Sequence, residues 1–204
     1  MALKLGKCWL ALVNKTNAQW YIPMNMETQL IVSAQSGNND AFSELIALYG
    51  KRIYFAAYSF LHNVDDAADI VQEVFLRAYK NIGSFDTKRA FYPWLYRIAK
   101  NLCINAVKRA SRRDIGLPSE EMIVSNSPDP AAELLKNEEK EQLRRAIEKL
   151  PEKQREIVNL KTFQGCSYAE MAEILNIPIG TVMSRLYSAR SRLRELLLEV
   201  TDGM

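Results

Sequence analysis

The sequence predicts an all-α protein built from two small helical domains joined by a flexible linker. Apolar residues recur at three- and four-residue steps over most of the chain, which is typical of amphipathic helices. Strands are not indicated, because no convincing stretch of alternating apolar and polar residues is present and the eight glycines do not cluster into turns. The helical pattern weakens at LPSEEMIVSNSPDPAAE (117–133), and so long a loop is unusual inside one compact domain.

These breaks divide the chain into four expected parts. Residues 1–26 form an N-terminal extension that we expect to be poorly ordered, and 27–110 form the first domain. A linker over 111–137 leads to a second domain over 138–200. The apolar run at 8–13 is too short to span a bilayer, so an ordered amphipathic anchor is only the alternative for the extension.

Composition excludes several classes of function. Three widely spaced cysteines (Cys8, Cys103 and Cys166) without CxxC spacing indicate a reducing compartment and no disulfide framework. With a single histidine in the sequence, we expect no zinc site and no other metal. The sequence has no phosphate-binding GxxxxGK and no nucleophile with a base nearby in sequence, so we expect neither a cofactor nor enzymatic activity. For Cys103 and Cys166, burial and redox sensing remain two alternatives.

The first domain is predicted to contain helices over 28–61, broken at SGNND (36–40), then over 65–82, and from about residue 92. In the helix over 65–82 the inward positions are predicted to be Ala68, Val71, Phe75 and Tyr79. Pro93 fits the first turn of the third helix, where its missing N–H would be unpaired anyway. The inward residues of that helix are predicted to be Leu95, Ile98, Ala99, Leu102 and Ala106.

An unusual combination of rings and positive charge lies at the start of the third helix. FYPWLYRIAKN (91–101) places four aromatics within six residues, pointing in several directions around any helix. The window 87–113 contains eight Lys or Arg and no Asp or Glu. Some of these rings belong to the core, and for Phe91 a core position and an exposed one are equally good interpretations.

The second domain contains a predicted helix-turn-helix at SYAEMAEILNIPIGTVMSRLYSARSRLR (167–194). Ser167 and Glu170 form a capping box that opens a short helix, and the NIP sequence ends that helix. A second helix starts near Gly180 or Thr181 with a polar and basic outer face, which is typical of DNA-reading helices. The alternative is a plain helical hairpin with solvated arginines. The residues predicted to be buried in the second helix are Val182, Leu186, Ala189 and Leu193, and those predicted to face outward are Met183, Ser184, Tyr187, Ser188 and Arg190.

Two segments resemble conserved regions of bacterial RNA polymerase sigma factors. Residues 65–86 (DDAADIVQEVFLRAYKNIGSFD) followed by 91–109 (FYPWLYRIAKNLCINAVKR) resemble the second region of that family. Residues 150–194, which contain the helix-turn-helix, resemble the fourth. A chain with these two regions alone is similar to the extracytoplasmic-function group, and the resemblance covers roughly 27–198.

The resemblance implies two DNA interfaces. The second region would hold the unpaired strand of the minus-ten element, with rings stacking on bases and cations following phosphates, beside a base pocket formed with the loop 83–90. Its implied contacts are Trp94, Tyr96, Arg97, Lys100, Asn101, Lys108 and Arg109. The fourth region would read the minus-thirty-five element in the major groove. Its implied contacts are Thr181, Ser184, Arg185, Tyr187, Ser188 and Arg190. Relatives often carry arginine where this chain has Met183 and Ser188, which leaves the preferred bases open.

The resemblance also implies protein partners. The acidic helix before the basic surface would dock on the clamp of the largest subunit of core RNA polymerase; a merely solvated acidic face is the alternative. The implied clamp contacts are Asp66, Asp69, Gln72, Glu73 and Phe75. Further implied partners are the polymerase flap, promoter DNA and an anti-sigma factor, with no small-molecule substrate. The location would be the cytoplasm, or the membrane surface if an anti-sigma partner holds the chain there.

Two other functions remain open from the sequence. An autonomous helix-turn-helix regulator would explain 150–194 but leaves the aromatic and basic helix at 91–109 without a role. A protein-binding module or enzyme would make both basic surfaces accidental. The promoter sequence, the inducing signal and the anti-sigma factor cannot be named from the sequence.

Overall fold

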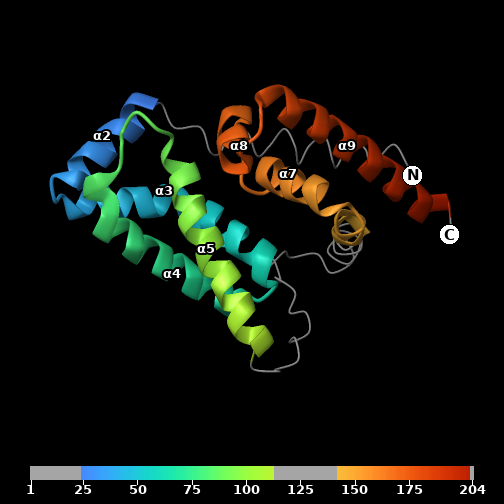
Figure 1. Cartoon of the computed structure of the whole chain (residues 1–204), viewed down its shortest axis with the longest axis horizontal. Coiled ribbons are helices and arrows are strands. Elements are labelled where there is room, and N and C mark those ends of the chain that lie inside the picture. Colours follow the sequence, from blue (N-terminus) through green and yellow to red (C-terminus); the bar gives the residue numbers. More distant parts are fainter. Residues whose placement is uncertain (1–23, 113–141, 203–204) are drawn as a thin grey trace, which may run out of the picture.

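The computed structural model describes residues 24–112 and 142–202, in which helices are joined by loops and turns and no strand occurs. Residues 113–137 of the predicted linker and 1–23 of the predicted N-terminal extension lie outside these residues, so both stay predictions, although residues 111–112 and 24–26 are helical. The first helical group comprises α2 (Met24–Gln35), α3 (Asn39–Leu61), α4 (Val64–Asn81), the short 3₁₀ helix η1 (Ile82–Ser84) and α5 (Phe91–Arg112). The second comprises a helical segment over 142–148, α7 (Glu152–Thr162), α8 (Tyr168–Leu175) and α9 (Ile179–Asp202) (Figure 1). The predicted all-α class is therefore confirmed.

Helices α3, α4 and α5 pack against one another, and α2 packs on α3 and η1. Their shared core contains Leu45, Ile53, Val74 and Leu95, each fully buried. Capping side chains set the helix boundaries, because the first N–H groups of a helix lack intrahelical partners. Asn38 accepts hydrogen bonds from the backbone N–H groups of Asp40 and Ala41 at the start of α3.

The buried face of α4 differs from the predicted one. Ala68 and Tyr79 are exposed, whereas Phe75 is buried. The residues of α4 that face the core are Ala67, Ile70, Val74, Phe75 and Ala78. The prediction gave weight to the aromatic residues and therefore rotated the expected buried face of α4 toward Tyr79. Tyr79 lies at the rim of the core, where its ring meets Phe42 edge-on at 5.1 Å and its hydroxyl donates a hydrogen bond to Asn39.

In the second helical group, α7 and α8 pack against α9. The predicted capping box is confirmed: Ser167 accepts from the N–H of Glu170, and the carboxylate of Glu170 accepts from the N–H of Ser167. Asn176, in the left-handed conformation with φ 52°, ends α8. Helix α9 begins at Ile179, and the four residues predicted to be buried (Val182, Leu186, Ala189 and Leu193) are all in the core.

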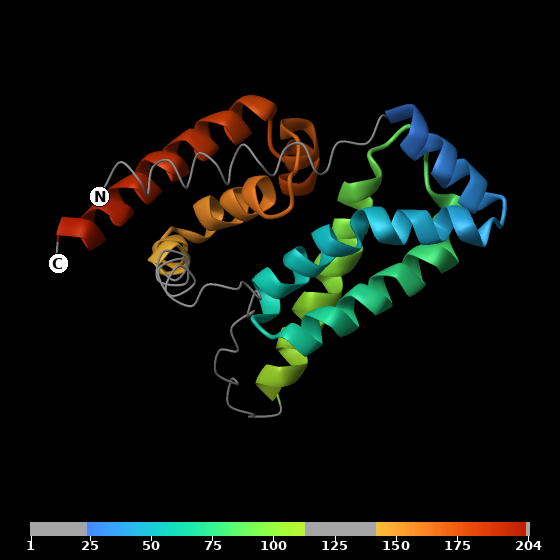
Figure 2. The ribbon, with the colours of Figure 1, turned by 180° about the vertical axis from the view of Figure 1, so that it is seen from behind.

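The two helical groups are in contact. Helix α5 packs against α8, and α3 packs against α7, as both views of the ribbon show (Figure 2). The rings of Phe55 and Phe163 contribute to this contact, with centroids 6.5 Å apart. Two domains were predicted from the sequence, but no contact between them was predicted.

Among the described residues, no helix is both long enough and apolar enough to cross a membrane.

Burial of Phe75 leads to a stability prediction. We expect Phe75→Ala to lower the free energy of unfolding by about 3–5 kcal/mol, because it removes a ring packed edge-on against Phe42 and leaves a cavity. Leu76→Ala, one residue along α4 but half exposed, should change the free energy by no more than about 0.5 kcal/mol. Urea denaturation followed by circular dichroism measures both. Equal effects of the two substitutions would contradict the packing described here.

Candidate nucleic-acid interface

One face of α5 presents a ring, an amide and two cations to solvent. Trp94, Arg97, Asn101 and Lys108 lie at helical spacing on this face, which we call the α5 stripe. Arg97, Asn101 and Lys108 are exposed. Trp94 is half-buried because its ring leans on Phe85, with centroids 5.0 Å apart, and on Phe91, at 5.4 Å. Phe91 is 1% exposed, so its interpretation as a core residue is confirmed.

The loop over 83–90 is held next to this stripe. The side-chain amide of Gln35 in α2 donates to the backbone oxygens of Ile82 (2.9 Å) and Phe85 (2.8 Å). Phe85 is buried beneath Trp94. Near the end of the loop, Arg89 forms an ion pair with Glu173 of α8 at 2.7 Å. The loop is thus positioned by both helical groups.

Two of the residues predicted to contact the unpaired strand are engaged within the protein, Tyr96 by burial and Lys100, which stays partly exposed, by an ion pair. Tyr96 is only 3% exposed, and its ring lies against Tyr92. Lys100 forms an ion pair with Glu156 of α7 at 3.1 Å. The prediction of Tyr96 as a surface residue is therefore wrong for this arrangement of the helices, because α7 and the turn before α8 cover that side of α5.

Helices α4 and α5 flank a groove of about 710 Å³. Its lining includes Asp69, Gln72 and Glu73 from the acidic helix and Arg109 from the basic one. Asp66, Asp69 and Gln72 are exposed and Glu73 is partly so, and Glu73 pairs with Arg77 at 2.6 Å. The predicted clamp contact at Phe75 is corrected, because this residue is 5% exposed and belongs to the core.

Helix α9 carries a mostly uncharged outer face at its N-terminal half. Met183, Ser184, Tyr187 and Ser188 are exposed, and Tyr187 reaches 78% exposure. Thr181, Arg185 and Arg190 are half-buried at the flanks. With 100° between successive residues, Ser191 and Arg194 continue the face of Tyr187, and both are exposed. Sequence reasoning did not include these two among the contacts, although their spacing of four and seven residues from Tyr187 was visible.

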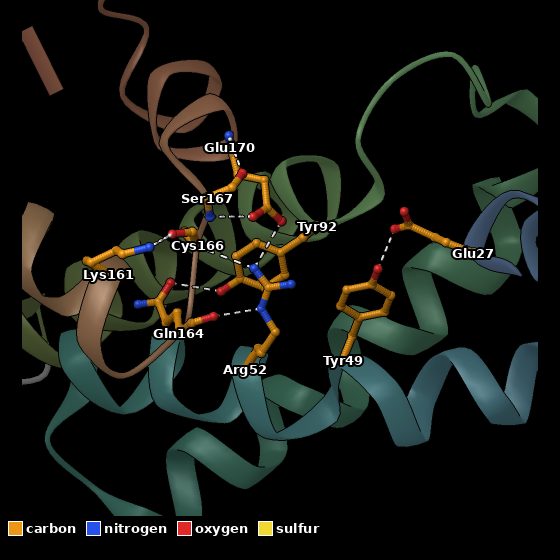
Figure 3. A network of polar contacts seen from close by, with 9 residues as sticks. All are labelled: Glu27, Tyr49, Arg52, Tyr92, Lys161, Gln164, Cys166, Ser167 and Glu170. Atoms are coloured by element: carbon orange, nitrogen blue, oxygen red, sulfur yellow. Dashed lines mark hydrogen bonds and ion pairs between the residues drawn. The ribbon is translucent and has the colours of Figure 1, made fainter. Parts of the chain in front are cut away.

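A buried polar network joins the two helical groups, and sequence reasoning missed it (Figure 3). At its centre is Arg52 of α3, which is 5% exposed. Its Nε donates to the backbone oxygen of Gln164 at 2.7 Å, and its Nη2 pairs with Glu170 at 3.0 Å. The guanidinium carbon lies 3.5 Å from the ring centroid of Tyr92, whose hydroxyl donates to the side chain of Gln164 at 2.8 Å. The available signal was an arginine at an otherwise apolar, core-facing position of α3, three residues after Tyr49.

Burial and charge shift several pKa values in and around this network. Burial is the largest single influence on Arg52 and works against its charged form, but the Glu170 carboxylate, Cys166 and Tyr92 together outweigh burial and raise the pKa of Arg52 above its ordinary value. Burial raises the pKa of the Cys166 thiol to about 12 and that of Cys103 to about 11. Burial also raises the pKa of Tyr92 and of Tyr96. Both cysteines are free and buried, so the burial alternative is confirmed for them.

These raised pKa values predict a loss of stability in alkali. A thiol or phenol whose pKa is higher in the folded state stabilises the fold below its unfolded pKa, and this contribution disappears as pH rises through the folded pKa. We therefore expect the melting temperature to fall progressively above about pH 9, the ordinary cysteine value, up to pH 12. Calorimetry at fixed ionic strength between pH 7 and pH 11 measures the effect. A melting temperature that stayed level or rose across that range would contradict the burial of these cysteine and tyrosine side chains.

Comparison with known proteins identifies the family. The model of "Sigma-70 region 2" matches residues 45–113, and that of "Sigma-70, region 4" matches residues 140–193. The ECF RNA polymerase sigma factor SigW of Bacillus subtilis is 38% identical over 180 residues, covering 83% of this chain and 96% of SigW. The RNA polymerase sigma-H factor of Pseudomonas aeruginosa is 31% identical over 185 residues, covering 86% of this chain and 96% of that protein.

Solved structures agree with the sequence relatives. CnrH in complex with the cytosolic domain of CnrY is similar with a TM-score of 0.61 and 29% identity, covering 84% of this chain and 97% of CnrH. The sigma factor RpoE from Bartonella quintana, solved with the anti-sigma factor NepR, has a TM-score of 0.58 and 27% identity, covering 76% of this chain and 96% of RpoE. Both regions match in order and the relatives are covered almost completely, so the chain belongs to the extracytoplasmic-function (ECF) sigma factors of RNA polymerase.

Proposed function

We propose that this sigma factor holds the unpaired minus-ten strand of promoter DNA on the α5 stripe. The observation that carries the proposal is the exposure of Arg97, Asn101 and Lys108 on one face, within a window (87–113) that contains no acid. Cations there can follow phosphates, the amide can bond a base edge, and the half-buried ring of Trp94 offers a stacking surface. The rigid seat of Trp94 on Phe85 and Phe91 lowers the entropy lost on stacking a base.

We further propose that the outer face of α9 reads the minus-thirty-five duplex in the major groove. Met183 and Tyr187 are apolar enough to contact thymine methyl groups, whereas Ser184 and Ser188 can bond base edges. Arg185 and Arg190 at the flanks, with Thr181 at the start of the helix, are placed to meet phosphates. Ser191 and Arg194 extend this proposed interface along the same face.

Core polymerase binding is proposed for the acidic face of α4. Asp66, Asp69, Gln72 and Glu73 line a surface that repels DNA and suits a basic protein partner. The proposed units are 27–110 for promoter opening and core binding and 138–200 for the minus-thirty-five element. Like other sigma factors, the chain is an initiation factor and not an enzyme.

An anti-sigma factor is proposed as a further partner, because the similar sigma factor RpoE from Bartonella quintana was solved in complex with the anti-sigma factor NepR. We propose the cytoplasm as the location, since the promoter DNA and polymerase that the chain would bind are found there.

The proposal is tested by adding purified bacterial core polymerase and genomic DNA fragments from the source organism to the full chain. Transcription start sites that appear only with the chain would support it, and their upstream sequences would identify both promoter elements. Binding of duplex DNA without any association with core would instead favour an autonomous helix-turn-helix regulator.

The double variant Arg97→Ala, Asn101→Ala tests strand capture. We expect promoter opening to fall by about 100-fold, because each contact is worth about 1–3 kcal/mol, while core affinity stays within about twofold. Permanganate footprinting measures opening, and gel filtration or fluorescence anisotropy measures core binding. Lys149→Ala, which removes an exposed cation from the second helical group, serves as the charge control. Loss of core binding in the double variant would mean that this face was wrongly assigned.

The double variant Asp69→Arg, Glu73→Arg tests the clamp assignment. Reversing two charges should weaken core binding by tenfold or more, since like charges at a protein interface cost several kcal/mol. Titration of labelled core polymerase measures the change, with Glu148→Arg in the second helical group as a control that reverses one exposed charge elsewhere. Unchanged affinity would remove α4 from the proposed core interface.

A further inference from the structure

The outer face of α9 carries two serines one helical turn apart, Ser184 and Ser188. Both are exposed, and both flank the exposed ring of Tyr187 in the proposed minus-thirty-five interface. A serine hydroxyl can donate one hydrogen bond and accept two, so a serine with no other partner can bond either kind of base edge. What each serine offers to DNA therefore depends on which part of its hydroxyl is already used within the protein.

The hydroxyl of Ser184 is used as a donor. It donates a hydrogen bond to the backbone oxygen of Thr181, three residues earlier in the same helix, at 3.2 Å. Serine often bonds a carbonyl of the preceding helical turn in this way. Because a hydroxyl has a single proton, this bond leaves only the oxygen lone pairs of Ser184 for a ligand outside the protein. Ser184 is thus left as an acceptor.

The hydroxyl of Ser188 is used in the opposite sense. Its oxygen accepts a hydrogen bond at 3.2 Å from Nε2 of Gln154, which lies in the first turn of α7. Among the described residues, Ser188 forms no bond to a carbonyl of its own helix. The bond from Gln154 occupies one lone pair, while the hydroxyl proton stays available for a ligand. Ser188 is thus left as a donor.

The amide of Gln154 has no other partner among the described residues. Gln154 is half-buried, and its Oε1 is buried without a hydrogen bond. Burying a carbonyl oxygen without a partner is unfavourable, so an apolar side chain of the same length would stabilise the packing of α7 on α9 at least as well. The contribution of this amide is therefore its bond to Ser188, at the exposed edge of α9.

We propose that Gln154 is a positioning residue that sets base specificity, because it holds Ser188 as a hydrogen-bond donor while the neighbouring Ser184 is held as an acceptor. The inference rests on the proposed function, in which this face of α9 enters the major groove. The acceptors in that groove are N7 and O6 of guanine, N7 of adenine and O4 of thymine, and the donors are the amino groups of adenine and cytosine. Ser188 therefore favours guanine or thymine over cytosine, and Ser184 favours adenine or cytosine.

The test measures base preference with the complete chain bound to core polymerase. Promoter fragments, found first by the start sites that depend on the chain, receive a randomised minus-thirty-five segment, and the fragments that the holoenzyme retains are sequenced. Ser188→Ala and Ser184→Ala identify the base that each serine faces, because the preference at that base is lost. The informative variant is Gln154→Met, which keeps the length of the side chain and removes the amide. The matched control is Lys153→Met, which places the same side chain at the neighbouring exposed position.

At the base that Ser188 faces, we expect the parent chain and Lys153→Met to prefer guanine or thymine over cytosine by about threefold to tenfold, the effect of one neutral hydrogen bond. With Gln154→Met the hydroxyl is free to turn and serves either kind of base edge, so the preference should fall below about twofold. The preference at the base that Ser184 faces should not change. Looser packing of α7 would instead weaken binding to all sequences alike. Because the readout is a ratio among bound fragments, it does not depend on the folded fraction of a variant.

A double variant, Gln154→Met with Ser188→Ala, checks that Gln154 acts through Ser188. Its base preferences should equal those of Ser188→Ala alone. A further loss of preference in the double variant would mean that Gln154 contacts DNA itself, and the positioning role would be overturned.

Three other results would overturn the inference while leaving the proposed function in place. They are a preference of the parent chain for cytosine at the base facing Ser188, a preference for guanine or thymine at the base facing Ser184, or a Ser188 preference that survives Gln154→Met. If no start site depends on the chain, or if neither serine substitution changes any base preference, the proposed function of this face fails together with the inference.

Discussion

The buried charge of Arg52 determines how the two halves of this sigma factor meet. A guanidinium removed from water needs partners at close range, and burial without them is costly. In the part of the chain that the structure describes, its hydrogen-bond acceptors all come from Gln164, Cys166 and Glu170 of the second helical group, whereas its own group supplies aromatic rings. The guanidinium can therefore form hydrogen bonds either with the second helical group or with water. A partly docked state would offer it neither set of partners.

Charge is separated by helix in the first group. Helix α4 displays carboxylates, α5 displays cations, and the two signs face each other across one groove. Under the proposed function, this separation lets the two neighbouring helices bind different partners, because like charges repel the wrong partner. The docked second group uses the same chemistry, because Glu156 and Glu173 meet the cations of α5 and its preceding loop as phosphates would.

Helical periodicity predicted much of the fold and only part of the site. Residues such as Val182, Leu186, Ala189 and Leu193 were correctly placed because burial on a single helix follows a local repeat. On α4 the repeat was ambiguous, and weighting toward aromatics put Tyr79 inside. The repeat correctly placed Phe75 inside, and only the family resemblance put it on a binding surface. Tyr96 and Arg52 could not be placed in this way, because their neighbours lie in another helical group, in the case of Arg52 and Gln164 some 112 residues along the chain. Periodicity carries no information on such pairings.

The carboxylate of Glu170 serves two donors at once: one oxygen accepts from the N–H of Ser167 and the other from Arg52. The side chain that starts the first helix of the helix-turn-helix is thus also half of the contact between the groups. Aspartate, shorter by one methylene, would reach at most one of these donors, and glutamine would keep the geometry without the charge. Position 170 therefore tolerates fewer residue types than either role alone would allow. A substitution there changes the cap of the helix-turn-helix and the contact between the two helical groups together.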